Sequence, residues 1–485
     1  MKRILLLVVI LISGVPVLVS AQKPKDQKFI WGVASASYQV EGAYQADGKG
    51  VSNWDVWTNQ YHVTQMMTGD VQTGNVSINE YDRTQYLKDI ALMKQLGINS
   101  YRFSISWARL LPEGTGKVND KGVKHYEEFI DALIANGIEP MITLFHWDLP
   151  QTLQAQGGWM NPKSVLWFAE YASLVFDKYG KKVKMFITFN EPYIDNFLIT
   201  PIIENSINKI SPPFPLSTET QASKATAANN ILLANATATQ IYHKKKLGGR
   251  IGITLSLAPK IPVNPNDPAD VKAALIADGM ENRLFLDPLF KGKYPADILA
   301  LYQPYNKNFS PTAADYALFA ANPPDFLGVN FYAPDYIKAD PKSPFGVPIF
   351  GENTDSVKMF NGPVRPEYLY KLLMRIKDDY NNPAMIITEN GAGFGPTDEK
   401  LEGGSVNDPL RADYIKRHID TAMVAKRDGA NLQGYTVWSI FDNFEWVFGY
   451  NRRFGIVYVD FKTQERIPKK SYYLYQASIR SYQKK

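Results

Sequence analysis

The segment KMFITFN (184–190) is a continuous run of apolar and β-branched residues that ends in an amide side chain. Seven similar runs are FIWGVAS (29–35), SYRFSIS (100–106), EPMITLF (139–145), RIGITLSL (250–257), DFLGVNFY (325–332), AMIITENG (384–391) and LQGYTVWS (432–439). Runs that are apolar at nearly every position are typical of strands buried on both faces, as in parallel sheets. The eight runs therefore predict eight parallel strands.

Longer amphipathic stretches separate these runs. The stretch 81–96 has apolar residues at three- and four-residue spacing, and helices are also predicted over 121–135 and 162–179, the last with Pro162 in its first turn. Alternating strands and helices predict an α/β fold, a single-domain (β/α)8 TIM barrel. A doubly wound open sheet is the alternative, but the first run continues as WGVASASYQVEG (31–42), which lacks the glycine-rich phosphate-binding fingerprint.

The composition excludes several classes of protein. The 485 residues are 45% hydrophobic and 21% charged, which is too apolar for a disordered chain, and the net charge of +5 is spread along the chain, unlike that of a nucleic-acid-binding protein. The absence of cysteine excludes disulfides, thiolate metal sites and cysteine nucleophiles. The five histidines lie far apart, so neither a metal nor a cofactor is predicted.

Residues 1–21 have the pattern of a signal peptide. Lys2 and Arg3 precede the apolar run 4–12, and Val19-Ser20-Ala21 matches a small-residue cleavage site. A membrane anchor is the alternative, but Ser13, Gly14 and Pro16 interrupt the apolar run. We therefore expect a secreted mature domain, residues 22–485, without stable membrane insertion. The sequons at Asn75, Asn235 and Asn308 are then glycosylation candidates.

Two glutamates follow apolar runs at the ends of predicted strands. Glu191 and Glu389 each stand beside an asparagine, Asn190 and Asn390. A single glutamate in such a place is often an ordinary loop residue. In a barrel, however, strand ends meet at one mouth, and two carboxyl groups at a common site are what retaining glycoside hydrolysis requires, one protonated and one ionised. Proximity of the two charges raises one pKa and helps to separate the roles.

The other predicted strand ends carry groups suited to a sugar. Trp147, Trp438 and Trp446 offer flat apolar faces for a pyranose ring, although core packing is the commoner role of any one tryptophan. Amides, a histidine and a further carboxylate offer hydrogen bonds to hydroxyl groups; these residues are Gln39, His146, Asn190, Asn330 and Glu445. The sequence therefore predicts a small-molecule glycoside or oligosaccharide as substrate. Oligomeric state cannot be read from these patterns.

At these residues the sequence resembles glycoside hydrolase family 1, the β-glucosidase family. The resemblance spans nearly the whole predicted mature chain, and TFNEP or ITENG alone is only moderately specific. The matching segments are FIWGVASASYQVEGA (29–43), SNWDVW (52–57), YRFSISWARLLPEG (101–114), LFHWDLPQTLQ (144–154), TFNEP (188–192), NFY (330–332), ITENG (387–391), SIFDNFEW (439–446) and RFGIVYVDF (453–461).

The resemblance implies a role for each matching position. Glu191 of TFNEP corresponds to the general acid/base and Glu389 of ITENG to the nucleophile, with Arg102 near the nucleophile and keeping it ionised. Asn190 corresponds to the residue that bonds the sugar 2-hydroxyl, and Tyr332 to the tyrosine that contacts the nucleophile. The positions that bind the non-reducing sugar, the glycone, are Gln39, His146, Trp438, Glu445 and Trp446.

The sequence departs from the family mainly around the fourth and fifth runs. The loop expected at 193–216 lacks the glycine-containing segment that many members carry, and ENRLFLDP (281–288) has Arg283 and Leu284 where Gly-Trp is frequent. These changes concern the side where the leaving group binds. A retaining β-glucosidase is the main hypothesis; the alternatives are a secreted sugar-binding protein with weak or no turnover and a thioglucosidase or defensive glucosidase. Glu191 argues against the plant-type thioglucosidases, which have glutamine there, and Glu445 against members that bind 6-phosphorylated sugars.

Overall fold

The computed structural model describes residues 28–210, 216–348, 351–352, 359–360, 362–395, 399 and 401–484. Within this part, eight strands form a closed barrel in the order β1-β12-β9-β7-β5-β4-β3-β2, and each neighbouring pair is parallel. The barrel strands are β1 (Ile30–Ala34), β2 (Ser100–Ser104), β3 (Glu139–Phe145), β4 (Met185–Asn190), β5 (Arg250–Ser256), β7 (Phe326–Asn330), β9 (Met385–Glu389) and β12 (Leu432–Trp438). The prediction of a (β/α)8 barrel is confirmed, and each of the eight apolar runs supplies one strand.

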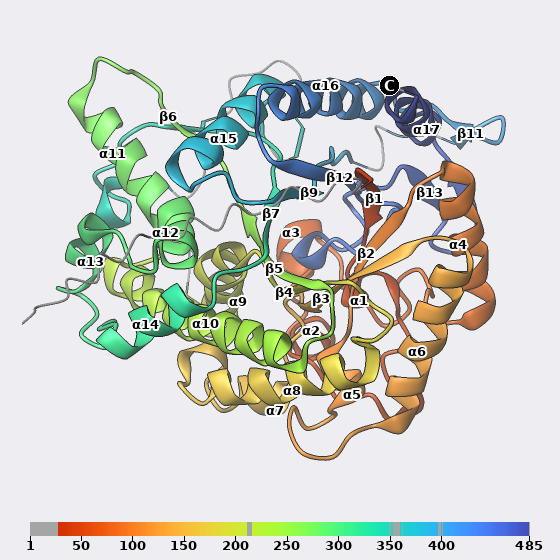
Figure 1. The fold of residues 1–485 in the computed structure, drawn as a ribbon, viewed down its shortest axis with the longest axis horizontal. Helices are drawn as coiled ribbons and strands as arrows, with labels where there is room; N and C mark the ends of the chain where they lie inside the picture. The colour runs from red at the N-terminus through yellow and green to blue at the C-terminus, as the bar shows by residue number, and fades with distance from the viewer. Residues whose placement is uncertain are drawn as a thin grey trace, which may run out of the picture.

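Helices surround the barrel (Figure 1). The longer ones are α4 (Arg83–Leu96), α6 (Asp120–Ala135), α8 (Ser164–Tyr179), α10 (Thr218–Lys245), α11 (Pro268–Asp278), α12 (Leu284–Lys291), α14 (Ala313–Ala321), α15 (Pro366–Asp379), α16 (Pro409–Arg427) and α17 (Lys470–Gln483). Shorter helices are α1 (Ser37–Val40), α2 (Asn53–Asn59), α3 (Gln65–Thr68), α5 (Trp107–Leu110), α7 (Gln151–Gln154), α9 (Thr200–Ile207) and α13 (Ala296–Tyr302).

The remaining elements are single turns and two-stranded sheets. The 3₁₀ turns are η1 (Ala46–Gly48), η2 (Gly158–Met160), η5 (Pro344–Gly346) and η6 (Trp446–Phe448), and the π-helical turns are η3 (Ile194–Ile199) and η4 (Gly279–Arg283). The sheets pair β6 (Lys260–Pro262) with β8 (Asp335–Ile337), β10 (Leu401–Glu402) with β11 (Ser405–Val406), and β13 (Val457–Val459) with β14 (Arg466–Pro468).

The predicted helices near the first strands begin and end for local reasons. The Asp82 side chain accepts a hydrogen bond from the Gln85 amide and caps the start of α4, and Gly97, with φ of 86°, ends the helix in the left-handed conformation. One boundary was predicted wrongly. Pro162 lies in the turn before α8, which begins at Ser164, so it does not occupy the first turn of the helix.

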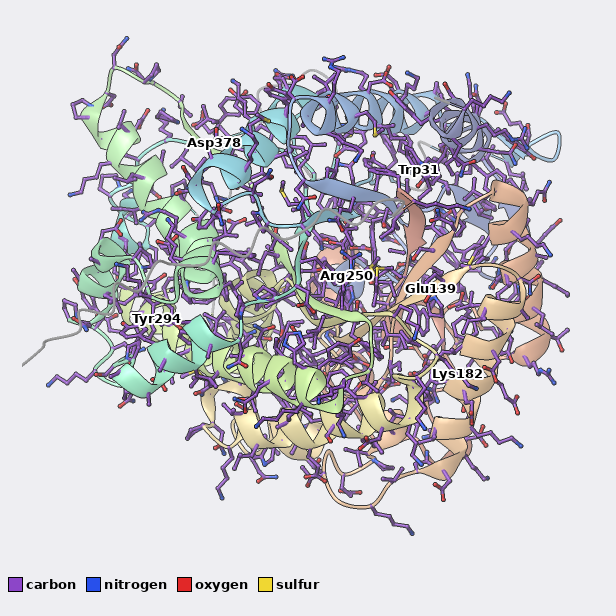
Figure 2. The ribbon with its side chains drawn as sticks, viewed as in Figure 1. Trp31, Glu139, Lys182, Arg250, Tyr294 and Asp378 are labelled. Carbon is purple, nitrogen blue, oxygen red and sulfur yellow. The ribbon has the colours of Figure 1, made fainter. Side chains whose placement is uncertain are left out.

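Three apolar clusters place the site at one end of the barrel. The main cluster packs the barrel against the helices and includes Trp31 of β1, which is labelled in Figure 2. A small cluster that includes Ile30, Met185 and Phe326 fills the barrel near the starts of its strands. An aromatic cluster that includes Trp147, Trp438 and Trp446 lies where the strands end. The polar strand ends therefore face this aromatic end, which we call the mouth.

The segment after Glu191 differs from the expected loop. Residues 194–207 form the π-helical turn η3 followed directly by α9, and Phe197 and Ile203 are buried. Apolar residues at Ile194, Phe197 and Ile203 give this segment a helical side to bury. The departure from the family's sequence therefore folds as helix over 194–207, and residues 211–215 lie outside the described residues.

Candidate active site

Glu389 is the last residue of β9 and is buried at the mouth. Its Oε1 atom lies 2.5 Å from Nη1 of Arg102, and its Oε2 atom accepts a hydrogen bond of 2.7 Å from the Tyr332 hydroxyl. A guanidinium and a hydroxyl donor on the two oxygens stabilise negative charge on this carboxylate. Both contacts that the family resemblance implied for Glu389 are present.

Arg102 is held in place by neighbouring strands. Its Nε donates to Oγ1 of Thr143 at 3.1 Å, and its Nη2 donates to Oδ1 of Asn190 at 2.6 Å. The side chain is 1% exposed on β2. Because a buried guanidinium without partners is costly, these bonds fix both its position and that of the Glu389 carboxylate.

Glu191 follows β4 directly and occupies a different environment. Its backbone has φ of 45°, its amide donates to the Thr254 carbonyl at 2.9 Å, and its Oε1 accepts from Nδ2 of Asn330 at 2.8 Å. Burial, and next the charge of Glu389, raise the pKa of Glu191 well above its usual range. The structure thus favours a protonated carboxyl at Glu191 beside a charged one at Glu389.

Asn190 connects the two carboxyl groups. Its Oδ1 accepts from Arg102 and, at 3.1 Å, from Nδ2 of Asn330, while its Nδ2 lies 2.9 Å from Nε2 of His146. Burial, and next the charge of Arg102, lower the pKa of His146 well below its usual range, so the ring is neutral. Since Nε2 accepts from an amide, the hydrogen is on Nδ1, and Nδ1 has no hydrogen-bond partner among the residues that the structure describes. It can therefore donate to a sugar hydroxyl.

Gln39 and Glu445 form the other side of the predicted sugar site. Gln39 is buried in α1, and its Nε2 donates to Oδ1 of Asn443 and the carbonyl of Phe444 at 3.0 Å each, and to Oε2 of Glu445 at 3.1 Å. Oε1 of Gln39 has no partner. Burial, and next the charge of Glu389, raise the pKa of Glu445 to about 8. Unpartnered buried polar atoms are costly, and a sugar hydroxyl bound here would satisfy them.

The aromatic side chains of the mouth pack around His146. Its ring centroid lies 5.7 Å from that of Trp438 and 5.9 Å from that of Trp446, with interplanar angles of 30° and 26°. Trp147 has a supporting role that the sequence did not indicate, because its Nε1 donates to the Asn190 carbonyl at 3.0 Å. Trp147 and Trp446 have φ of 77° and 49°. Such backbone is unfavourable for bulky residues and persists only where packing determines it.

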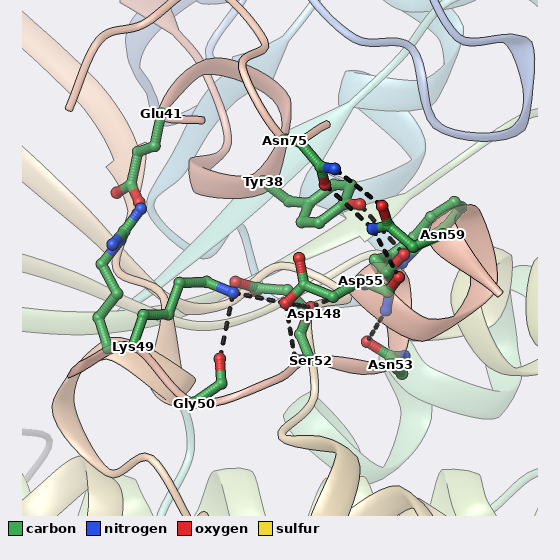
Figure 3. A network of polar contacts seen from close by, with 12 residues as sticks. Tyr38, Glu41, Lys49, Gly50, Ser52, Asn53, Asp55, Asn59, Asn75 and Asp148 are labelled. Atoms are coloured by element: carbon green, nitrogen blue, oxygen red, sulfur yellow. Dashed lines mark hydrogen bonds and ion pairs between the residues drawn. The ribbon is translucent and has the colours of Figure 1, made fainter. Parts of the chain in front are cut away.

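A polar network, drawn in Figure 3, joins the segments that follow β1 and β3, the segments that carry Gln39 and His146. Asp148 accepts a hydrogen bond of 3.1 Å from the Ser37 hydroxyl, and Asn53 donates to the Trp147 carbonyl at 3.1 Å. Lys49 pairs with Asp55 at 2.5 Å, and Asp55 also accepts from the amide of Ser52. Burial raises the pKa of Asp148 to about 7. The network joins the segment after β1 to the end of β3.

Several supporting residues were missed by the sequence analysis. Thr143 bonds to Arg102, Thr388 bonds to Asn330, and Asn443 bonds to Gln39. Thr388 and Asn443 lie inside the quoted motifs ITENG and SIFDNFEW, so position within a motif was the available signal. Nothing in the spacing of the sequence indicated Thr143, which is near Arg102 only because β2 and β3 pair.

The three sequons lie in different environments. Asn308 is exposed, and Asn75 is half-buried with its side chain bonded to that of Asn59. Asn235 is 1% exposed within α10, and its Oδ1 accepts a bond of 2.7 Å from Thr188. A glycan does not fit at this buried position in the folded protein, so the structure disfavours Asn235 among the three candidates.

Two negative findings apply to the described residues only. Among them no group of three or more histidine, cysteine, aspartate or glutamate side chains has the arrangement needed to hold a metal ion. In the same part of the chain, no helix is both long and apolar enough to cross a membrane. The predicted signal peptide, residues 1–21, lies outside the described residues.

Residues 21–484 match the family model of glycosyl hydrolase family 1. Beta-glucosidase A of Enterobacter agglomerans is 41% identical over 459 residues, covering 93% of this chain and 94% of the relative. A 6-phospho-beta-glucosidase, GmuD of Bacillus subtilis, is 37% identical, covering 92% and 95%. The family 1 β-glucosidase from Thermotoga maritima in complex with isofagomine lactam has a TM-score of 0.82 and 38% identity, covering 93% and 97%.

The fold and the paired carboxyl groups define a class of barrel enzyme that hydrolyses glycosides. The chain belongs to glycosyl hydrolase family 1 and is an O-glycosyl hydrolase.

Proposed function

We propose that the protein is a retaining β-glucosidase that removes terminal non-reducing β-D-glucosyl residues from small glycosides or oligosaccharides. The family assignment and the β-glucosidase relatives support this activity. The observation that carries the assignment of roles is the contrast between two buried carboxyl groups. Glu389 is paired with Arg102 and Tyr332, whereas Glu191 receives only the neutral amide of Asn330.

The reaction proceeds by two displacements. In the first, a Glu389 oxygen attacks the anomeric carbon while Glu191 donates its proton to the departing glycosidic oxygen, leaving a glucosyl ester on Glu389. In the second, Glu191, now ionised, accepts a proton from water as the water oxygen attacks the same carbon and releases Glu389. Glucose leaves with the β-configuration, and Glu191 is again protonated.

Hydrolysis of an aryl β-glucoside by the purified protein tests the activity. We expect turnover by the wild type and a loss of roughly 10⁴- to 10⁶-fold in Glu389→Ala, the scale found when a nucleophile is removed. Glu139→Gln is the matched control, because Glu139 is a glutamate at the opposite end of a barrel strand, at the start of β3 (Figure 2). Full activity of Glu389→Ala would exclude Glu389 as the nucleophile.

Glu191→Ala tests the second role. With a good leaving group the first step should persist, so the glucosyl-enzyme should accumulate, and added azide should restore release by replacing water as the nucleophile without needing a base. A variant in which azide restores no turnover, and no glucosyl-enzyme accumulates, would contradict the assignment of Glu191. Retention of both glutamates with their partners favours an active enzyme over a sugar-binding protein.

One relative is a 6-phospho-β-glucosidase, so we expect a residue of this chain to distinguish glucosides from their 6-phosphates. Glu445 is buried and receives the Gln39 amide, an arrangement that suits hydroxyl groups, whereas a phosphate needs cationic partners. We therefore expect hydrolysis of aryl β-glucoside and no measurable hydrolysis of its 6-phosphate. A preference for the phosphorylated substrate would contradict this part of the proposal.

We also propose that the chain is secreted and loses residues 1–21. The pattern of Lys2, Arg3, the apolar run 4–12 and Val19-Ser20-Ala21 supports this proposal. N-terminal sequencing of protein collected from the medium should begin at Gln22. Retention of Met1 in membrane-associated protein would support an anchor instead.

A further inference from the structure

We propose that Glu281 and Asp335, held together by Lys260, are specificity-determining residues that favour cationic over anionic leaving groups. This inference rests on the proposed glycosidase function and concerns the part of the substrate that departs. The three residues, called here the ion cluster, come from η4, β8 and β6, and Glu281 lies in the segment 281–288, which departs from the family's sequence.

The ion cluster stands beyond the ends of β5 and β7, two barrel strands whose residues Thr254 and Asn330 contact Glu191. The sheet β6–β8 follows β5 and β7 along the chain, and Lys260 is paired in register with Asp335. At the strand ends below it, Ser256 pairs with Asn330, the residue that donates to the Glu191 carboxyl. The cluster is therefore placed beyond the acid/base at the mouth.

The charges of the ion cluster do not cancel. Lys260 Nζ donates to Oε2 of Glu281 and to Oδ2 of Asp335. The Lys260 side chain is 3% exposed and that of Glu281 is 10% exposed, whereas that of Asp335 is 36% exposed. Two carboxylates around one ammonium leave a net charge of −1, and Asp335 exposes part of it to solvent.

The field of the ion cluster reaches the acid/base side of the mouth. The charges of Glu281 and Asp335 contribute to a raised pKa of Tyr193, after burial, and that of Glu281 adds to the raised pKa of Glu191. Tyr193 lies two residues after Glu191 and its ring packs on Phe197, with centroids 5.0 Å apart. A leaving group passing Tyr193 thus meets a negative potential.

Three aryl β-glucosides of similar shape test the inference. They carry a para-aminomethyl group (cationic), a para-carboxylate (anionic) or a para-methyl group (neutral). We measure kcat/KM at low ionic strength above pH 7, because burial raises the pKa of Glu281 to about 7. For each enzyme we divide kcat/KM for the cationic glucoside by kcat/KM for the anionic one, and we compare this ratio between the wild type and the variant. The intrinsic reactivities of the leaving groups cancel in this comparison.

Asp335→Asn removes the net charge without leaving a buried ion unpaired, because Lys260 keeps Glu281. We expect the cationic-to-anionic ratio to fall about fourfold, because one charge acting through water at roughly 10 Å attracts the cation and repels the anion, and we expect the difference to fade in high salt. Glu281→Gln, which leaves Lys260 paired with Asp335, should also lower the ratio.

Asp420→Asn is the matched control. It removes the same charge from α16, where Asp420 pairs with Lys416 on the outer layer of the barrel, and should leave the ratio unchanged. If the ratio is unchanged in both cluster variants and the neutral glucoside is still hydrolysed, the inference is overturned but the proposed function is not. Failure of the wild type to hydrolyse the neutral glucoside would instead overturn the proposed function.

Discussion

The two halves of the mouth are built differently. The proposed glycone half, which comprises Gln39, His146, Trp438, Glu445 and Trp446, is connected by hydrogen bonds and ring contacts and lies within, or for Trp438 directly beside, the motifs that resemble family 1. The leaving-group half, which comprises Tyr193, Lys260, Glu281 and Asp335, is held by an ion cluster outside those motifs. The contrast indicates that recognition of the sugar and recognition of the leaving group are set by separate parts of the chain.

Glu191 lies between the two halves, and replacing it should have an effect second only to that of Glu389→Ala. Glu191 donates only in its protonated form, and its raised pKa keeps that form present to higher pH, so the reactive form is lost as pH rises through that value. Glu191→Gln should reduce kcat/KM for a poor leaving group by about 10²- to 10⁴-fold and remove the basic limb of the pH profile. A basic limb that persists in the variant would assign it to another group.

Arg102→Met should damage the glycone half by freeing Glu389. Removing one member of a buried ion pair costs about 3–5 kcal/mol of stability, and the nucleophile loses its position as well. Urea unfolding measures the loss of stability and aryl glucoside hydrolysis the loss of activity. Arg375→Met is the control, because Arg375 on α15 pairs with Asp278, which keeps Arg283. Equal stability losses in the two variants would mean that the Arg102–Glu389 pair stabilises the fold no more than the Arg375–Asp278 pair does.

Glu445→Gln tests whether Glu445, in the glycone half, contacts the 6-hydroxyl group of the sugar. A buried group left without its hydrogen-bond partner costs about 1–3 kcal/mol, so kcat/KM for a β-glucoside should fall roughly 5- to 150-fold. A 6-deoxy-β-glucoside, which differs only in lacking the 6-hydroxyl group, should lose less, which moves the preference toward the deoxy sugar. Paired kcat/KM measurements with the two aryl glycosides give the ratio. An equal loss for both sugars would show that Glu445 does not contact the 6-hydroxyl.

The smallest effect on activity is expected from the loss of a glycosylation candidate far from both halves of the mouth. In protein expressed through a eukaryotic secretory pathway, Asn308→Gln should remove one glycan mass and leave kcat/KM unchanged, because Asn308 is exposed. Asn235 should carry no glycan, since its side chain is buried against Thr188. Mass spectrometry of the intact variants decides both points, and a glycan on Asn235 would contradict the packing of α10.

The sequence predicted the barrel, and with it the meeting of the polar strand ends at one mouth, for one physical reason. Parallel strands buried on both faces leave continuous apolar runs, and the polar residues at their ends must share one mouth, so Glu191 and Glu389 could be placed before their contacts were known. The segment 193–207 was expected to be a loop and instead forms η3 and α9, because its apolar residues pack into the mouth.

The ion cluster could not be predicted from the sequence. Glu281 and Asp335 lie 21 and 75 residues from Lys260, on elements that meet only after the barrel closes. A charged residue near the end of a strand is usually solvated, and nothing in the local pattern distinguishes one that is buried and paired. The sequence showed only that this region departs from the family, through residues such as Arg283 and Leu284.

Covalent trapping of the glucosyl-enzyme tests the central claim, that Glu389 attacks while Glu191 donates the proton. A 2-deoxy-2-fluoro β-glucoside with a good leaving group slows both steps, because fluorine destabilises the oxocarbenium-like transition state, but allows the first to outrun the second. Peptide mapping should find one fluoroglucosyl mass on the peptide that contains Glu389. An adduct on Glu191, or no adduct from an enzyme that releases the opposite anomer, would contradict the account.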